Sequence, residues 1–296
     1  MRLTSILSSK LVKEAIETNL AKTIKVDHWL TPKSIPYKKD TIVKLLNQNG
    51  VHYGNVILFV QYGKRNPADF PEICVDDLVL SLVFYKTVAD IVNWMMAIKL
   101  YSKVQPQKVL TLAMMKPLYM KWGEKIYQCL RRHRYNKGQV KRHFADTTTN
   151  VELGHKLSRG CTLAIYVGHG RSRGWSGYRG FRWRHLNQFK QTVPIGSLIS
   201  LSCNSLLHDK KESLPMGLQL IMEGRSCTFF GTWDSVHIVP LRTITKILLA
   251  IFTNAQKVTV GELIADAHSQ VLALNDALVL ENWLKFRLIG SPFQII

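Results

Sequence analysis

The chain has 296 residues, of which 46% are hydrophobic, and its 40 lysines and arginines against 20 aspartates and glutamates give a net charge of +20. No apolar run approaches the roughly 20 residues of a membrane-spanning helix, and the first twenty residues lack the apolar core of a signal peptide. We therefore expect a globular, cytoplasmic protein with a sizeable core that contacts no membrane. Its positive charge attracts polyanions and acidic proteins.

Five cysteines are scattered along the chain without a C-x-x-C pair, which argues against a zinc ribbon or a redox dithiol. We expect them to be free thiols, most of them buried. Three candidate histidines lack helical ligand spacing and a nearby carboxylate partner, namely His185, His208 and His237. The sequence therefore predicts no metal and no cofactor.

The first third of the chain gives few signals. A strand is predicted over 56–61, a loop over 63–71 and a helix over 88–96. Pro106 lies in the stretch 101–107, which is a plausible boundary. We predict a smaller N-terminal α/β or α-rich region of unknown role over residues 1–104, and a larger domain over residues 105–296.

From residue 105 onward, apolar runs and helical patterns alternate regularly. Strands are predicted over 108–114, 140–144, 161–167, 198–203 and 226–231, and helices over 119–132, 151–157, 216–223, 240–255 and 260–274. Short extended pieces over 286–289 and 293–296 close the chain. Strands that are apolar throughout and alternate with helices are typical of a mostly parallel sheet covered on both faces. In such sheets, active sites form beyond the carboxyl ends of the strands.

Two of these predicted strands stop at a reactive side chain. One is followed by His169 and Gly170, and the other ends at Cys203. A thiol and an imidazole are what a cysteine nucleophile and its base require. We predict that Cys203 attacks a carbonyl as a thiolate, that His169 transfers the proton, and that the backbone N–H groups of Gly170 and Cys203 hold the oxyanion.

Residues 108–296 resemble the caspase-hemoglobinase fold, and most closely its CHAT branch, which is related to separase and gingipain. The resemblance rests on the segments YVGHG at 166–170, SLSCN at 200–204, MEGRSCTFFGTWD at 222–234, GELIADA at 261–267 and FRLIGSP at 286–292. Ser291 departs from the aspartate that is usual in the last of these. The resemblance implies an α/β sandwich and a cysteine endopeptidase, gated by an activating or inhibitory protein, a nucleotide or processing. By analogy, a role in bacterial defence or programmed death follows.

The sequence leaves the preferred substrate residue open. By the resemblance, Trp233 and Asp234 lie where the family binds substrate, and the Asp234 carboxylate suits an arginine or lysine of the substrate. Lys116 and Arg171 suit an acidic residue instead. Asp234 is also a candidate loop cap, and the glycine-rich segment from Arg171 to Arg184 reads as a solvated loop or a mobile lid beside the site.

Two other functions compete with this hypothesis. Ser172 lies in a G-x-S-x-G pattern, which would make it the nucleophile of a serine hydrolase with Asp234 and His268, although no helical pattern follows it. The chain is alternatively a catalytically silent scaffold or a basic module that binds nucleic acid or an acidic protein. Aromatic residues among the arginines would then stack on bases, although no recognised nucleic-acid motif accompanies them. Retention of both His169 and Cys203 favours an enzyme acting on protein substrates.

Overall fold

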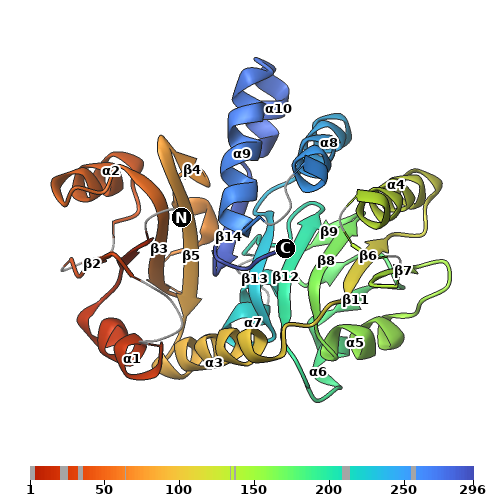
Figure 1. The fold of residues 1–296 in the computed structure, drawn as a ribbon, viewed down its shortest axis with the longest axis horizontal. Coiled ribbons are helices and arrows are strands. Elements are labelled where there is room, and N and C mark those ends of the chain that lie inside the picture. The colour runs from red at the N-terminus through yellow and green to blue at the C-terminus, as the bar shows by residue number, and fades with distance from the viewer. Residues whose placement is uncertain are drawn as a thin grey trace.

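The computed structural model describes residues 4–20, 26–32, 36–63, 65–133, 135–136, 138–208, 214–254 and 258–296. Within these residues the chain forms one large mixed sheet with helices on both faces, together with a small second sheet (Figure 1). The end of the predicted helix 240–255 lies outside the described residues.

The large sheet has eleven strands among the described residues, in the order β2-β1-β3-β5-β14-β13-β12-β8-β6-β7, with β4 paired to β5. Neighbouring strands run parallel except for the β13–β14 and β4–β5 pairs. The strands are β1 (Thr4–Leu7), β2 (His28–Leu30), β3 (Tyr53–Gln61), β4 (Cys74–Val75), β5 (Asp77–Tyr85), β6 (Val109–Ala113), β7 (Val140–Phe144), β8 (Cys161–Val167), β12 (Ile195–Leu201), β13 (Ser226–Thr232) and β14 (Phe286–Gly290). The predicted mostly parallel α/β fold is confirmed.

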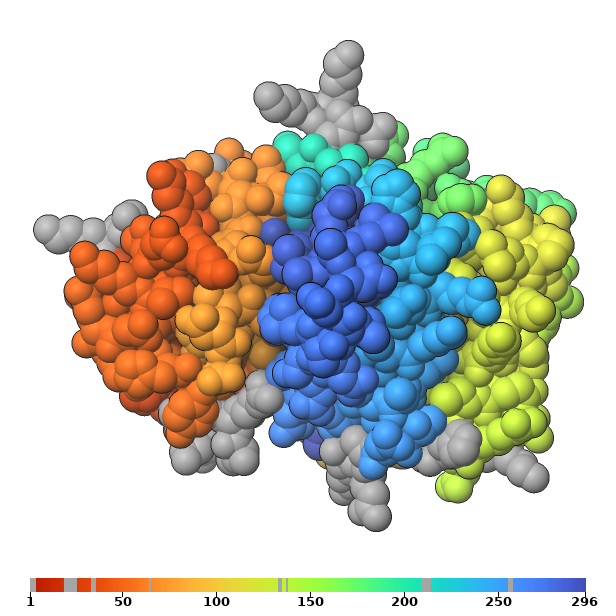
Figure 2. Space-filling view, turned by 90° about the horizontal axis from the view of Figure 1, so that it is seen from above, coloured from red at the N-terminus to blue at the C-terminus, as the bar shows by residue number. Residues whose placement is uncertain are grey.

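Two helix layers cover the sheet and enclose two hydrophobic cores. The helices are α1 (Lys10–Leu20), α2 (Lys39–Gln48), α3 (Val88–Val104), α4 (Pro117–His133), α5 (Asn150–Ser158), α6 (Trp183–Asn187), α7 (Met216–Met222), α8 (Ile238–Asn254), α9 (Val260–Ala273) and α10 (Ala277–Trp283), with a 3-10 turn η1 at Pro67–Asp69. Seen from above, α9 and α10 in dark blue lie between the orange N-terminal part and α4 in yellow (Figure 2). None of the helices described is long and apolar enough to cross a membrane.

Local sequence signals account for several element boundaries. Thr149 caps α5 by accepting from the Glu152 N–H, while the Glu152 carboxylate accepts from the Thr149 N–H at 2.8 Å. This reciprocal arrangement satisfies two N–H groups that have no partner inside the helix. Thr259 and Glu262 repeat it at the start of α9. Such caps fix the residue at which each helix begins, and therefore where the loop before the helix ends.

The N-terminal part continues the same sheet. Strand β5 pairs in parallel with β14, the last strand of the chain, through Ser81↔Leu288 and Leu82↔Ile289. The buried Arg287 strengthens this junction, because its guanidinium donates to the carbonyls of Pro67 and Phe70. The proposed division at residue 104 stays a prediction.

Candidate active site

The carboxyl ends of β8 and β12 lie side by side at the edge of the sheet. The two strands pair in parallel, with Ser200 opposite Tyr166 and Leu201 opposite Val167. His169 and Cys203 each stand two residues beyond the last of these pairs. The expectation that they follow neighbouring parallel strands is therefore confirmed.

The backbone turns sharply directly after Cys203. Asn204 has a left-handed conformation with φ 58°, which asparagine tolerates better than most residues, and its N–H donates to the Asp234 carbonyl at 3.2 Å. The half-buried Cys203 thiol lies against Val236, with Sγ 3.4 Å from the Val236 nitrogen and 3.5 Å from its carbonyl oxygen. The backbone N–H of Val236 is thus placed to donate to a thiolate at this position.

His169 is exposed, and its imidazole lies between two side chains of the segment after β6. Lys116 Nζ is 3.4 Å from Nε2, and the Tyr119 hydroxyl is 3.5 Å from Nδ1. Although the residue as a whole is exposed, partial desolvation of its ring, followed by the charge of Lys116, lowers the pKa of His169. The imidazole is therefore held toward its neutral form, which is the form that accepts a proton.

The backbone of His169 is fixed as well. Its carbonyl oxygen accepts from the Ser176 N–H and from the Tyr166 hydroxyl, each at 3.0 Å. Next to it, a methyl group at Gly170 would overlap the carbonyl oxygen of Cys203. Only glycine permits this close approach of the two loops. The oxyanion roles of Gly170 and Cys203 stay a prediction.

Tyr119 belongs to the site, and the sequence analysis missed it. Its ring meets the imidazole of His169 edge-on, with ring centroids 5.1 Å apart, and packs edge-on against Trp122. Burial first, and the charge of Cys203 second, raise the pKa of Tyr119. In the sequence, Tyr119 lies on the apolar face of the helix over 119–132, which indicates packing. The one signal that could have identified it is its place in the first helical turn after a strand of a parallel sheet, where active-site residues gather.

Three of the predicted substrate-binding residues lie in two loops: Lys116 follows β6, and Trp233 and Asp234 follow β13. Lys116 contacts His169, as described above. The Asp234 carboxylate accepts from the Ser235 N–H at 2.6 Å and lies 4.0 Å from Lys285 Nζ, so a basic substrate side chain would compete with Lys285. Trp233 is half-buried, with the guanidinium carbon of Arg287 5.9 Å from its ring centroid. Substrate contact by these residues stays a prediction.

The segment after His169 is not the solvated loop that its glycines indicated. It forms a small antiparallel sheet of β9 (Gly170–Arg171), β10 (Gly174–Trp175) and β11 (Phe181–Arg182), in the order β11-β10-β9. The Trp175 ring stacks on Tyr166 at 4.2 Å and on Phe181 at 5.3 Å. The rings of Trp175 and Phe181 are buried, so these two side chains do not offer the stacking surface that the alternative of base binding requires. Burying them stabilises the small sheet.

The structure also removes the support for a serine nucleophile. The Ser172 hydroxyl is buried, and strand β10 follows it where a hydrolase elbow requires a helix. His268 lies on α9, where its Nδ1 accepts from the Trp283 indole N–H at 3.0 Å. Within the part of the chain that the structure describes, no group of histidines, cysteines and carboxylates is arranged to hold a metal ion.

Comparisons with known proteins agree on the fold. The chain is similar to a complex of the Porphyromonas gingivalis RgpB pro- and mature domains, with a TM-score of 0.79 and 12% identity over 99% of this chain and 79% of that one. It is similar to the Arg-specific cysteine proteinase gingipain R (RGPB), with a TM-score of 0.76 and 12% identity over 100% and 78% of the two chains. A further structure, described as a protease, has a TM-score of 0.72 and 13% identity over 99% and 78%. The TM-scores show a shared fold despite these low identities, and they confirm the predicted α/β sandwich.

A search of curated proteins found no match. The profile of peptidase family C25 matches residues 85–293, which is well over half of the chain. The resemblance to the CHAT branch in particular stays a prediction. On the strength of the profile match, this chain belongs to peptidase family C25.

Proposed function

We propose that this protein is a cysteine endopeptidase in which Cys203 is the nucleophile and His169 the general base and acid. The observation that carries the proposal is the parallel pairing of β8 with β12, since it brings one imidazole and one thiol to adjacent strand ends. The family match and the fold shared with a cysteine proteinase support the same chemistry.

The reaction proceeds in two stages. His169 takes the thiol proton, and the Cys203 sulfur adds to the carbonyl carbon of a peptide bond. The C–N bond then breaks, the proton passes to the leaving amine, and the acyl group remains on Cys203 as a thioester. Water, deprotonated by His169, hydrolyses the thioester, which releases the carboxylate and restores the thiol. The N–H groups of Gly170 and Cys203 stabilise the oxyanion at each stage.

The contacts in this structure describe a resting site. Within the described residues, the imidazole nitrogens contact Lys116 and Tyr119, while Cys203 Sγ contacts the backbone of Val236. We propose that the two side chains turn toward one another before attack. A partner, an effector or processing that favours this rotation would gate the enzyme. The complex of pro- and mature domains formed by RgpB supports a protein as the gating partner.

The proposal is tested by comparing wild-type protein with Cys203→Ala on a denatured protein mixture. We expect wild type to cut the mixture and Cys203→Ala to leave it intact while remaining folded, because the change removes one small, half-buried atom. Cys129→Ala is the matched control, since Cys129 is also a half-buried free cysteine but lies on α4 away from the sheet edge. Equal cleavage by wild type and Cys203→Ala would refute the assignment.

A further inference from the structure

The two faces of the small β9–β11 sheet differ in chemistry. Gly170, Trp175 and Phe181 are paired across its three strands, as are Arg171, Gly174 and Arg182. Because side chains of paired residues point to the same face, the first row faces the core and the second faces away from it. Both Trp175 and Phe181 are buried, whereas Arg171 and Arg182 are exposed. The outer face therefore carries arginines on both flanks of a central glycine.

This outer face is hollowed into an open groove of about 330 Å³. Gly174 has φ 147°, and a methyl group there would overlap the carbonyl oxygen of Phe181, so the central strand admits no side chain. The missing side chain leaves space between the flanking guanidinium groups. Two further arginines line the groove, Arg173 and Arg179.

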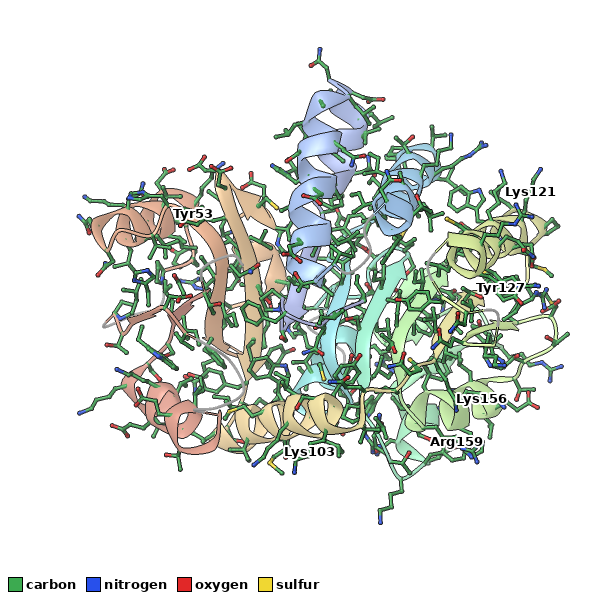
Figure 3. The ribbon with its side chains drawn as sticks, in the orientation of Figure 1. Tyr53, Lys103, Lys121, Tyr127, Lys156 and Arg159 are labelled. Carbon is green, nitrogen blue, oxygen red and sulfur yellow. The ribbon has the colours of Figure 1, made fainter. Side chains whose placement is uncertain are left out.

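The lining of the groove is basic. Four arginines line it, and none of its described lining residues is acidic. Basic side chains are common elsewhere on this surface, and Lys103, Lys121, Lys156 and Arg159 project outward from both helix layers (Figure 3). Those residues are spread over α3, α4 and the C-terminal end of α5, whereas the arginines of the groove line one hollow. The exposed guanidinium groups of Arg171, Arg179 and Arg182 would attract an anion placed between them.

The position of the groove indicates what binds it. Arg171 follows His169 by two residues. An extended peptide spans about 3.3 Å per residue, so a substrate cut at Cys203 reaches the groove within several residues. Arg171 and Arg182 lie on strands two apart, which separates their backbones by about 10 Å. A single carboxylate is too small to contact both arginines across that distance. Several acidic side chains spaced along an extended segment can each pair with one guanidinium.

We propose that the arginine-lined groove of the β9–β11 sheet is a docking site for an acidic segment of the polypeptide substrate. The proposal rests on the proposed endopeptidase function and names the substrate class that it would favour. It assigns the acidic preference to a segment several residues from the cut and makes no claim about the residue at the cut itself. The charge of +20 on the whole chain supports the approach of such substrates.

The test measures binding without cleavage. A fluorescein-labelled octa-glutamate peptide is titrated by fluorescence anisotropy with Cys203→Ala protein in 150 mM salt, where the Debye length is about 8 Å and distant charges are screened. We expect Arg171→Gln/Arg182→Gln, placed in the same background, to weaken binding at least tenfold. The matched control Lys44→Gln/Lys103→Gln removes the same charge from exposed sites on α2 and α3, and should weaken binding less than twofold.

Each remaining outcome overturns the proposal. Equal weakening by the two double variants would show that general charge, and no built site, holds the peptide. Tighter binding of tripolyphosphate or octa-thymidylate through Arg171 and Arg182 would make the groove a phosphate site. As a control for folding, the thermal unfolding midpoint of Arg171→Gln/Arg182→Gln should lie close to that of the Cys203→Ala protein. Because the assay needs no catalysis, failure of the groove is distinguishable from failure of the protease, which shows only in cleavage by wild type.

Discussion

At the scale of single residues, the proposed mechanism depends on the protonation of His169. Burial and the Lys116 ammonium 3.4 Å away lower the pKa of His169, and only the neutral imidazole accepts the thiol proton. Lys116→Met removes the second of these causes, so the pKa of His169 rises. The acid limb of the profile of kcat/KM against pH then moves to higher pH. Lys121→Met, which removes an exposed lysine one turn further along α4, should leave the limb in place. A limb that stays or moves to lower pH in Lys116→Met would contradict this coupling.

At the scale of elements, the small β9–β11 sheet is what holds His169 in position. Trp175 stacks on Tyr166, donates to the Ser200 hydroxyl at 2.9 Å and pairs with Gly170 across the sheet. Trp175→Ala removes a buried aromatic ring, which costs about 3–5 kcal/mol of unfolding free energy. We expect urea unfolding to show a loss of this size together with loss of cleavage, and Trp175→Phe to lose less of both. A loss below about 1 kcal/mol would mean that the sheet is attached by other contacts.

The elements also show what the sequence could predict. Strands β7 and β8 have the predicted bounds. Strand β8 is an almost wholly apolar run that ends before Gly168, whereas β7 is apolar only at its two ends, Val140 and Phe144. Strand β5 was missed because only Lys86 and Thr87 separate it from α3, so strand and helix together form one long, mostly apolar stretch of sequence. Strands β9, β10 and β11 have two residues each, too few for any periodicity. They form only because Tyr166 provides a surface on which their aromatic side chains pack, and that surface depends on the tertiary fold.

At the scale of the whole molecule, one buried arginine connects the two ends of the chain. Arg287 on β14 is 5% exposed and donates to the carbonyls of Pro67, Phe70, Leu284 and Phe286. Burial lowers the pKa of Arg287 to about 10, so it remains charged at neutral pH. Arg287→Met leaves these buried carbonyls without their donor, and we expect a loss of about 3 kcal/mol in unfolding free energy. Arg242→Met, on an exposed face of α8, should change it by less than about 0.5 kcal/mol. Equal effects of the two substitutions would contradict the role of Arg287.

In the candidate site, too, the residues marked by local sequence were predicted, and those placed by tertiary packing were not. His169 and Cys203 were predicted because each follows an apolar strand, and the topology of parallel sheets brings such ends together. Tyr119 and Val236 were not, because their contacts with the imidazole and the thiol depend on how α4 and the loop after β13 pack. The ion pair between Lys285 and Asp234 was not predicted either, because it joins residues that are far apart in the sequence.

The most direct test of the central claim is mass-spectrometric mapping of new N-termini. Wild type, Cys203→Ala and His169→Ala are each incubated with a complex protein lysate, with Cys129→Ala as the control for a change of thiol elsewhere. The account predicts new termini with wild type and Cys129→Ala, none with Cys203→Ala, and a decrease of about 10²–10⁴-fold with His169→Ala. New termini that appear equally with wild type and with Cys203→Ala would contradict the claim that this protein cuts polypeptides through Cys203.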